Sequence, residues 1–523
     1  MAYTEAKWIY PKEIFSWWYV DNVEDTFLAD KFSPYLRNAR LDWTSIATRP
    51  WHNLFAELTT WDYPKWISSY YRSNPNNNVI LVRHNQDTNK KLVTITSTWT
   101  ITAISTSTNI TSNNRMNFVN TWDVIYCMNW SDLYWKLSWT TYTLPTTWVS
   151  NLAPSFWIIF NSSMWVSWWS TNSNIVYKSV ADDFDDFNSS WADTFTFDEQ
   201  ITWLATNSQA LFYFTKNTIS VTWVWDIEET SWSITYFTRK LQVKEWAVNH
   251  NSIVSVWVNL FFLTPSNKIA RIRRWMDIDW FEIEDISERK YQWIDNLMNT
   301  LDKDQTDSFG YYLPKENLIK WHLKSKNATF NDVCIVYDVT KDAFLVDTQK
   351  FFYWWTFFDW LNYTISMIEP KVYLDEYAND DEDTAIQFTY YTKRFDLSSP
   401  TWKKELWETR TYLAINDLAE LTQEIYIDWN LIDTKIINKN NIPISSWWIW
   451  TYPIWTEPIW NWWYNWWDEM YYVTVLRTKW NLQKKGKYIQ IVYKNNSLAG
   501  RCKLINLWMK IEQLPSEATN LTD

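Results

Sequence analysis

Four aspartates form the most compact group of potential metal ligands in this chain. Asp182, Asp183, Asp185 and Asp186 lie within one short segment. Closely spaced carboxylates can converge on a hard cation such as Ca²⁺. The Asp-x-Asp-x-Asp-Gly-x5-Glu calcium loop is absent, however, so we expect a solvated loop here and no metal site.

The other residue types that support catalysis are scattered. The 4 histidines and 3 cysteines are His52, His84, His250, His322, Cys127, Cys334 and Cys502. None has the HxH, HExxH or CxxC spacing of a metal or redox site. Two facing carboxylates could hydrolyse a glycan, but 60 acidic residues give no basis for choosing a pair. We therefore predict no catalytic residue, no cofactor and no metal.

A hydrolase motif arises only if tryptophan is read as glycine. Residues 165–169 would then spell the G-x-S-x-G turn that exposes a nucleophilic serine. That turn needs a strand followed by a helix, whereas this segment is typical of a hairpin. Trp165, in Ser-Met-Trp-Val, also suits a strand as a genuine tryptophan. We discount the motif.

The composition is the reason for considering such a reading. The 523 residues include 45 tryptophans and only 3 glycines. At an ordinary frequency of roughly 7%, about 37 glycines would be expected. The deficit of glycine is about as large as the surplus of tryptophan.

The positions of the tryptophans favour the same interpretation. Trp43, Trp130 and Trp429 each follow an Asp or Asn, where Asp-Gly and Asn-Gly turns need a residue with positive φ. The doublets at 17–18, 354–355 and 447–448 resemble Gly-Gly turns. Some bacterial lineages and their phages read UGA as glycine, so we hypothesise that most of these tryptophans are UGA codons. The alternative, a Trp-rich protein, would not place indoles between turn residues. We expect Trp165 and Trp321 to be genuine.

The charge argues against a nucleic-acid-binding surface as the main function. Net charge is −12 and the pI is about 5.0. Phosphate neutralisation needs clustered Lys and Arg, and the one basic run, 271–274, is short. The N-terminus has no signal-peptide pattern, and prolines and asparagines interrupt the aromatic stretch 445–467. We expect no membrane insertion.

The periodicity predicts an all-β fold. Short runs rich in Val, Ile, Thr, Tyr and Phe alternate with turn residues, as in 79–83, 156–160, 211–214 and 333–337. Hairpin units recur about every 40 to 50 residues, the spacing of β-propeller blades. This predicts a propeller of six or seven blades, the alternative being a string of β-sandwiches. A short helix is expected over 293–303.

One N-terminal motif carries a resemblance to a known family. It reads Arg37-Asn38-x-Arg40, then Asp42-Trp43, then Arg49-Pro50-Trp51. With glycine at 43 and 51, it resembles the motif of the β-propeller proteins of tailed-phage necks and tails. These include the tail-tube nozzle and stabilisation proteins of short-tailed phages.

Further segments match the same family in order, over about residues 10 to 500. Residues 161–168 and 174–179 resemble its "N-x-L-W-V-x-G … V-Y-W-S" blade, which contains Trp165. Residues 181–187 resemble the Asp-x-x-Asp-Phe tail of that blade, and 214–219 resemble its "F-K-x-x-S-I" strand. Residues 391–397, which include Lys393, resemble the start of its C-terminal sandwich.

The resulting domain prediction has four parts. Residues 1–55 form an N-terminal arm carrying the Arg-Asn-x-Arg … Arg-Pro motif, and 56–355 form the propeller. Residues 356–515 form a C-terminal β-sandwich-like domain, and 516–523 form a tail.

The resemblance implies a non-enzymatic virion protein of the tail or head-to-tail junction, made in the host cytoplasm. Its expected partners are copies of itself in a ring around the DNA channel, neighbouring tail or connector proteins, and passively the DNA. Two alternatives remain. A host-surface glycan-recognition propeller would have an aromatic and carboxylate-lined pocket. A glycan-cleaving propeller would have two facing carboxylates.

Overall fold

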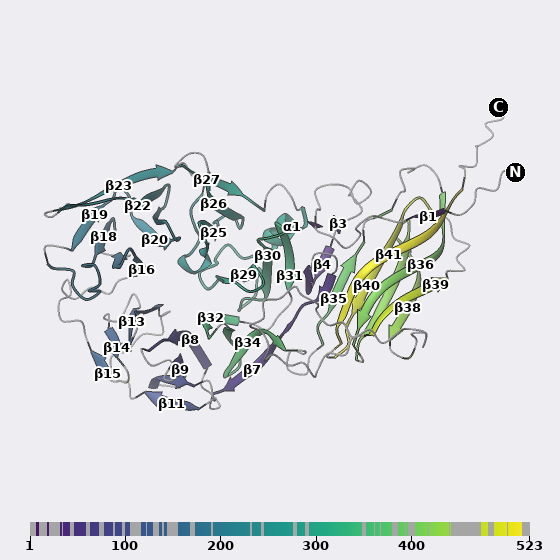
Figure 1. Cartoon of the computed structure of the whole chain (residues 1–523), viewed down its shortest axis with the longest axis horizontal. Helices are drawn as coiled ribbons and strands as arrows, with labels where there is room; N and C mark the ends of the chain where they lie inside the picture. The colour runs from purple at the N-terminus through teal and green to yellow at the C-terminus, as the bar shows by residue number, and fades with distance from the viewer. Residues whose placement is uncertain are drawn as a thin grey trace.

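The computed structural model shows an all-β molecule, with a β-propeller beside a β-sandwich-like domain (Figure 1). The structure describes residues 7–9, 18–19, 32–33, 35–41, 46–58, 63–72, 78–86, 89–96, 100–104, 117–121, 123–128, 135–138, 141–143, 155–167, 173–189, 192–230, 233–241, 245–275, 280–287, 292–347, 352–359, 361–366, 368–378, 385–392, 394–395, 403–416, 418–438, 440, 472–479, 486–498 and 500–514. Asp42, Trp43, Lys393, the loop 443–467 and the tail 516–523 lie outside these residues.

Among the described residues, seven antiparallel groups of four strands build the propeller. The first three are β8–β11 (Tyr63–Tyr70, Val79–Gln86, Asn89–Ile95, Ile101–Ile104), β12–β15 (Asn117–Asn120, Val124–Met128, Trp135–Ser138, Thr141–Thr143) and β16–β19 (Phe156–Phe160, Ser163–Ser167, Ile175–Lys178, Asp193–Thr196). The next three are β20–β23 (Ile201–Thr206, Ala210–Thr215, Ile219–Thr230, Ser233–Leu241), β24–β27 (Val254–Val256, Asn259–Leu263, Ile269–Trp275, Trp280–Asp285) and β28–β31 (Phe309–Leu313, Leu318–Leu323, Val333–Asp338, Ala343–Asp347). The last is β32–β34 (Phe352–Phe358, Leu361–Ser366, Lys371–Ala378) with β7 (Trp51–Glu57).

The seventh blade joins the two ends of the propeller. Strand β7, from the N-terminal segment, pairs with the outer side of β34 and places Ala56 opposite Val372. Toward the first blade, the Ser69 N–H donates to Thr356 Oγ1 at 2.8 Å, and the Trp66 and Trp354 ring centres lie 6.1 Å apart. The ring is therefore closed by segments that are about three hundred residues apart in sequence.

Strand position explains the residue patterns of the blades. The central strand β21, Ala-Leu-Phe-Tyr-Phe-Thr, is buried along its whole length, whereas the outer strand β19 alternates between exposed and half-buried residues. Apolar clusters fill the spaces between successive blades, such as Phe212 and Phe214 with Leu260 and Phe262. A strand with neighbours on both faces reads as a continuous apolar run, while an outer strand alternates.

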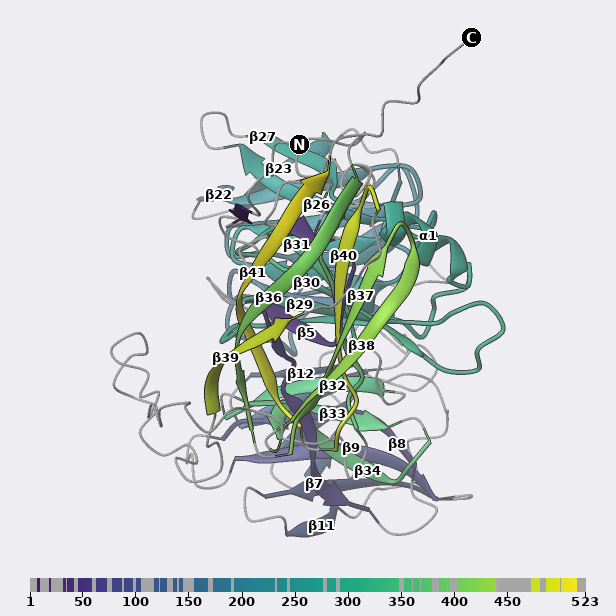
Figure 2. The ribbon, with the colours of Figure 1, turned by 90° about the vertical axis from the view of Figure 1, so that its right-hand side faces the viewer.

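The sandwich-like domain consists of two sheets that share one core. One contains β4 (Tyr35–Arg37), β35 (Phe388–Tyr391), β40 (Ile489–Asn495), β37 (Glu420–Ile427) and β38 (Asn430–Asn438) in that order. The other contains β39 (Tyr472–Lys479), β36 (Lys403–Ile415), β41 (Cys502–Leu514), β6 (Ile46–Thr48) and β5 (Ala39–Leu41), with β1 (Lys7–Ile9) on β41. Figure 2 shows these green and yellow strands in front of the propeller. Thr411 and Tyr493 hydroxyls, 2.8 Å apart, join the two sheets.

The predicted domain limits need correction. The limit at 355/356 falls inside β32, and the predicted arm supplies β7 to the propeller and β4, β5 and β6 to the sandwich. The blades therefore span 51–378 rather than 56–355. Long-range pairing, which local periodicity does not reveal, is the reason. The remaining arm strands, β2 (Trp18–Tyr19) and β3 (Phe32–Ser33), pair with each other.

The short helix lies where the sequence predicts it. Helix α1 (Gln292–Thr300) buries Ile294 and Met298, four residues apart on one face. Within the described residues, no helix is long and apolar enough to cross a membrane.

Candidate functional site

The N-terminal motif lies where the propeller and the sandwich meet. Strand β4 pairs with β31 of the sixth blade, with Arg37 beside Val346, and on its other side with β35, where Arg37 lies opposite Thr389. Through β4, the sheet of the sixth blade continues into the sandwich. The side chain of Arg37 is half-buried at this junction.

Asn38 connects three parts of the molecule. It is buried, with φ of 51°, a left-handed conformation that Asn tolerates better than most residues. Its N–H donates to the Val346 carbonyl at 2.9 Å, and its amide Nδ2 donates to the Gln387 carbonyl at 2.8 Å. Its Oδ1 accepts from Arg49 Nε at 3.3 Å. Asn38 thus binds the propeller, the sandwich and the second half of the motif together.

Arg40 forms a two-point ion pair with Asp347 at the end of β31. Its two terminal nitrogens donate to the two carboxylate oxygens at 3.1 and 2.7 Å. This fork geometry is the strongest arrangement available to Arg and a carboxylate. Burial raises the pKa of the Asp347 carboxyl, but Arg40, Arg49 and Lys320 together lower it to about 2. Asp347 is therefore ionised at neutral pH.

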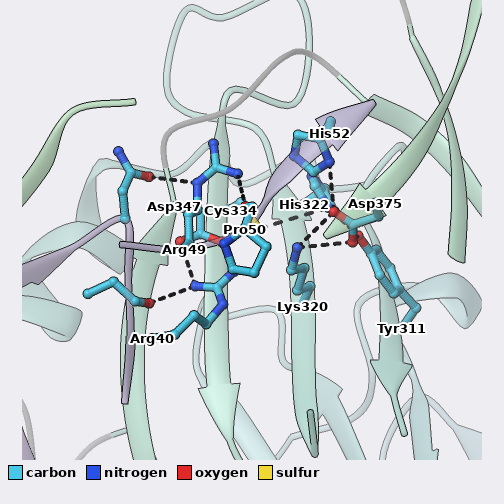
Figure 3. Close-up of polar contacts among 12 residues, drawn as sticks. Arg40, Arg49, Pro50, His52, Tyr311, Lys320, His322, Cys334, Asp347 and Asp375 are labelled. Atoms are coloured by element: carbon cyan, nitrogen blue, oxygen red, sulfur yellow. Dashed lines mark hydrogen bonds and ion pairs between the residues drawn. The ribbon is translucent and has the colours of Figure 1, made fainter. Parts of the chain in front are cut away.

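Arg49 is fully buried, and Figure 3 shows it beside this pair. Its side chain donates to Asn38 Oδ1 and, at 3.1 Å, to the Pro50 carbonyl. The chain then enters β7. Only the backbone of Trp51 is described, and it pairs with Ala378.

A second buried group next to the motif was missed by the sequence analysis. The Lys320 ammonium lies 3.0 Å from both oxygens of Asp375, Tyr311 donates its hydroxyl hydrogen to Asp375 at 2.7 Å, and His52 Nδ1 lies 2.7 Å from it. Burial opposes ionisation, but Lys320 and His52 hold the pKa of Asp375 well below its usual range. The available signal was Lys320 in the strand Leu-Ile-Lys-Trp-His-Leu, where His322 is the one other polar residue.

The one Cys and His close together in this region do not form a nucleophilic pair. Cys334 Sγ lies 3.9 Å from His322 Nε2. Burial and Lys320 lower the pKa of His322 to about 3, despite the opposing charge of Asp375. Burial also raises the pKa of the Cys334 thiol. The thiol is buried and protonated, and the imidazole beside it is neutral. This thiol therefore does not supply a thiolate nucleophile.

The acidic loop holds two blades together. Asp186 accepts from the N–H groups of Asn188 and Ser189, and Asp185 pairs with Lys136 of the second blade. Among the described residues, no three His, Cys, Asp or Glu side chains are grouped as metal ligands. Trp165 lies in strand β17, with Ser167 in the same strand, while residues 168–169 lie outside the description.

Two tryptophans occupy turn positions that favour glycine. Asp428 and Trp429, with φ of 46° and 74°, form the two-residue loop between β37 and β38. Positive φ at both positions is the I′ pattern, for which Asp-Gly is preferred. Trp257, with φ of 53°, is the first residue of the β24–β25 loop, the glycine position of a II′ turn. Their side chains are 68% and 66% exposed.

Two other tryptophans fit the core as indoles. Trp165 and Trp321 are buried, and their Nε1 atoms donate to the Phe160 carbonyl at 3.1 Å and the Ser252 carbonyl at 3.0 Å. Gly310 lies opposite Trp321, and a Cβ at 310 would come within 2.6 Å of the indole. The doublet Trp354-Trp355, predicted as a turn, instead lies inside β32 and packs on the core. Its neighbours in an aromatic run place it in a strand.

A cavity of about 340 Å³ lies among the first strands of five blades. Its lining includes Leu204, His250, Asn251, Trp354 and Trp355. The described lining contains no Asp or Glu. It therefore offers aromatic and amide contacts but not a pair of carboxylates.

No protein-family model matches this chain, and no curated protein matches it. Among solved structures, it is similar to YCF48 bound to D1 peptide (12% identity, TM-score 0.39), covering 62% of this chain and 97% of that one. YCF48 from Cyanidioschyzon merolae has 7% identity and a TM-score of 0.39, covering 62% and 98%. The WD40 repeats of RRP9 have 8% identity and a TM-score of 0.38, covering 62% and 99%. This likeness concerns the propeller fold and carries no statement about function.

Proposed function

We propose that this chain is a structural protein of a tailed-phage virion, located in the tail or at the head-to-tail junction, where copies assemble as a ring around the DNA channel. The observation that carries the proposal is the place of Arg37, Asn38, Arg40, Arg49 and Pro50. The motif that resembles the phage tail family is the segment that joins the propeller to the sandwich. Its partners would be neighbouring copies and adjacent tail or connector proteins.

The chemistry of the junction supports a mechanical role. The carboxylates of Asp347 and Asp375 are buried and held by Arg40 and Lys320. A catalytic acid or base must reach a substrate and have a pKa near the working pH. These groups meet neither condition. They are suited to fixing two domains at a constant angle, as an assembly under mechanical force requires.

The cavity argues against glycan cleavage. Glycosidases place two carboxyl groups on either side of the scissile bond. The described lining of the cavity contains neither Asp nor Glu. We therefore propose that this cavity does not cleave glycans, in keeping with the non-enzymatic structural role proposed above.

Glycan recognition is a second candidate, because one wall of the cavity is aromatic. Trp354 and Trp355 could pack against a sugar ring, with Asn251 as a hydrogen-bonding partner. The test is calorimetric titration with host-surface polysaccharide, repeated on Trp355→Ala. A saturable binding heat that is lost in the variant would favour glycan recognition. If the original chain gives no binding heat, the structural role remains the proposal.

We also propose that UGA is read as glycine where this protein is made. Among the described residues, Trp257 and Trp429 support this, since each lies in a left-handed turn conformation that favours glycine. The chain would then be a propeller with an ordinary glycine content and ordinary hairpin turns.

Peptide mass spectrometry of purified virions tests both proposals. The peptide should cover residues 42–51, which include Trp43 and Trp51. Glycine at both positions in a virion-derived peptide is the expected result. Tryptophan at these positions would overturn the recoding. Complete absence of the chain from virions would overturn the structural role, whatever residue occupies position 43.

A further inference from the structure

Lys320 and Asp375 form a fully buried pair between two blades (Figure 3). Lys320 lies in β29 of the sixth blade and Asp375 in β34 of the seventh, and neither side chain is exposed to solvent. The Lys320 Nζ lies 3.0 Å from each carboxylate oxygen, so the carboxyl carbon between them is within the roughly 3–3.5 Å of a near-attack geometry. An amine and a carboxyl group held in this way can condense to an amide.

Two further side chains contact the same carboxylate. Tyr311 lies directly opposite Lys320 in the blade and donates its hydroxyl hydrogen to one oxygen of Asp375 at 2.7 Å. His52 Nδ1 lies 2.7 Å from the other oxygen. The pairing of β34 with β7 shifts its register in the segment that contains Asp375, and such an irregularity re-aims a side chain. Each oxygen of the carboxylate is therefore contacted by one further polar group besides the ammonium.

These two neighbours are themselves buried among aromatic rings. Tyr311 stacks on Phe309 with the ring centres 6.1 Å apart, and Phe352 meets His52 edge-on at 4.7 Å. Two charges are costly in such a site, whereas an amide that replaces them is neutral. Because both partners are removed from solvent, an amide formed there is also protected from hydrolysis.

We propose that Lys320 and Asp375 join in an intramolecular isopeptide bond that links the sixth blade to the seventh. The bond from Nζ to the carboxyl carbon Cγ forms, and one Cγ–O bond breaks. Two protons of the ammonium group leave with that oxygen as water, and the third stays on the amide nitrogen. The reaction needs no oxidant, cofactor or second protein. It goes beyond the proposed function, which requires no covalent change in the chain.

The contacts on the carboxyl group assign a role to each neighbour. Burial opposes ionisation of Asp375, but Lys320 and His52 hold its pKa well below its usual range, so the pair is charged before it reacts. The reaction therefore starts with proton transfer from the ammonium to the carboxylate, which removes two buried charges. The neutral amine then attacks Cγ, while the Tyr311 hydroxyl stabilises the negative charge that develops on its oxygen. His52 lies at the other oxygen, which must gain protons to leave as water.

Peptide mass spectrometry of the full chain tests the bond. After complete digestion under denaturing and reducing conditions, the peptide with Lys320 should remain joined to the peptide with Asp375. The joined pair should be lighter than the sum of the two peptides by the mass of one water. Lys320→Arg keeps the positive charge but lacks a reactive amine, so its two peptides should be recovered separately. The comparison does not depend on which tryptophans are read as glycine, because both proteins carry the same ones.

Lys341→Arg is the matched control. Lys341 Nζ also lies 3.0 Å from a buried carboxylate, but it contacts one oxygen of Asp338 and also donates to the Leu41 carbonyl. This variant should keep the bond between 320 and 375. Full recovery of the two separate peptides from the original chain would overturn the proposal, and so would an unchanged joined pair in Lys320→Arg. Either result would leave the virion role untouched, since that role is decided by the presence of the chain in virions.

Discussion

Trp429 and Trp165 differ in backbone conformation and in burial. Trp429 has a φ of 74° and is mostly exposed, and Arg394 Cζ lies only 2.9 Å from the centre of its ring. Trp165 is buried with its Nε1 hydrogen-bonded. The local structure therefore favours glycine at one position and tryptophan at the other.

Substitution of each by glycine should have opposite effects on stability. Trp429→Gly relieves the strain of a left-handed tryptophan but gives the unfolded chain more conformational freedom. The net result should be a stabilisation of about 1 kcal/mol. Trp165→Gly removes a buried indole and should cost about 4 kcal/mol or more. Urea unfolding of the two variants measures both values. A destabilised Trp429→Gly protein would contradict the assignment of that position to glycine.

Buried His322 should make the protein sensitive to mild acid. Its pKa is about 3 in the folded protein, against about 6.5 in an unfolded chain. Because the pKa of His322 is lower in the folded protein than in the unfolded chain, its contribution to the free energy of unfolding is fully present above about pH 6.5. That contribution declines as the pH falls from 6.5 toward 3. By pH 5 the free energy of unfolding should have fallen by about 2 kcal/mol. Asp347, with its pKa lowered to about 2, adds a further loss between about pH 4 and 2.

The measurement is the free energy of unfolding of the original chain and of His322→Gln at pH 7.5 and pH 5. Between pH 7.5 and pH 5, the free energy of unfolding of the variant should fall by about 2 kcal/mol less than that of the original chain. Equal losses in the two proteins would show that another group carries the acid sensitivity.

At the scale of elements, local sequence predicts the strands within each blade but not those that close the ring. The runs at 79–83, 156–160, 211–214 and 333–337 all lie in strands, because each carries its own apolar pattern. Strand β4 has only three residues, and its partners β31 and β35 lie hundreds of residues away. Strand β7 likewise finds β34 only in the folded chain. Local periodicity contains no information about such pairings.

Proline in β7 should open the propeller at its closure. Ala56 is buried and pairs with Val372, so Ala56→Pro would break the outer strand of the seventh blade. We expect faster hydrogen exchange in β32–β34 and also in β8, because β8 bonds to β32 across the closure. Thr194→Pro is the control, since it breaks the outer strand of the third blade, which closes nothing. Equal, purely local effects of the two prolines would show that β7 does not hold the ring together.

At the scale of the whole molecule, the junction is the part of the site that sequence could only partly predict. The motif identified Arg37, Asn38, Arg40, Arg49 and Pro50, and the structure brings them together. Asp347, Lys320 and Asp375 are not in the motif, because they come from blades six and seven. Their contribution follows from burial: a charge removed from water needs a partner, and the fold supplies it from distant strands.

The continuous sheet through β4 should make the propeller and the sandwich unfold together. We expect a single calorimetric transition for the full chain. Asn38→Gly keeps the left-handed backbone but removes the side-chain bonds to Gln387 and Arg49, so it should separate the transition into two. Asn207→Ala is the control, because Asn207 is also buried and hydrogen-bonded, but between two blades. It should lower the single transition without dividing it. Two transitions already present in the original chain would show that the domains are independent, and the rigid junction on which the structural role rests would be lost.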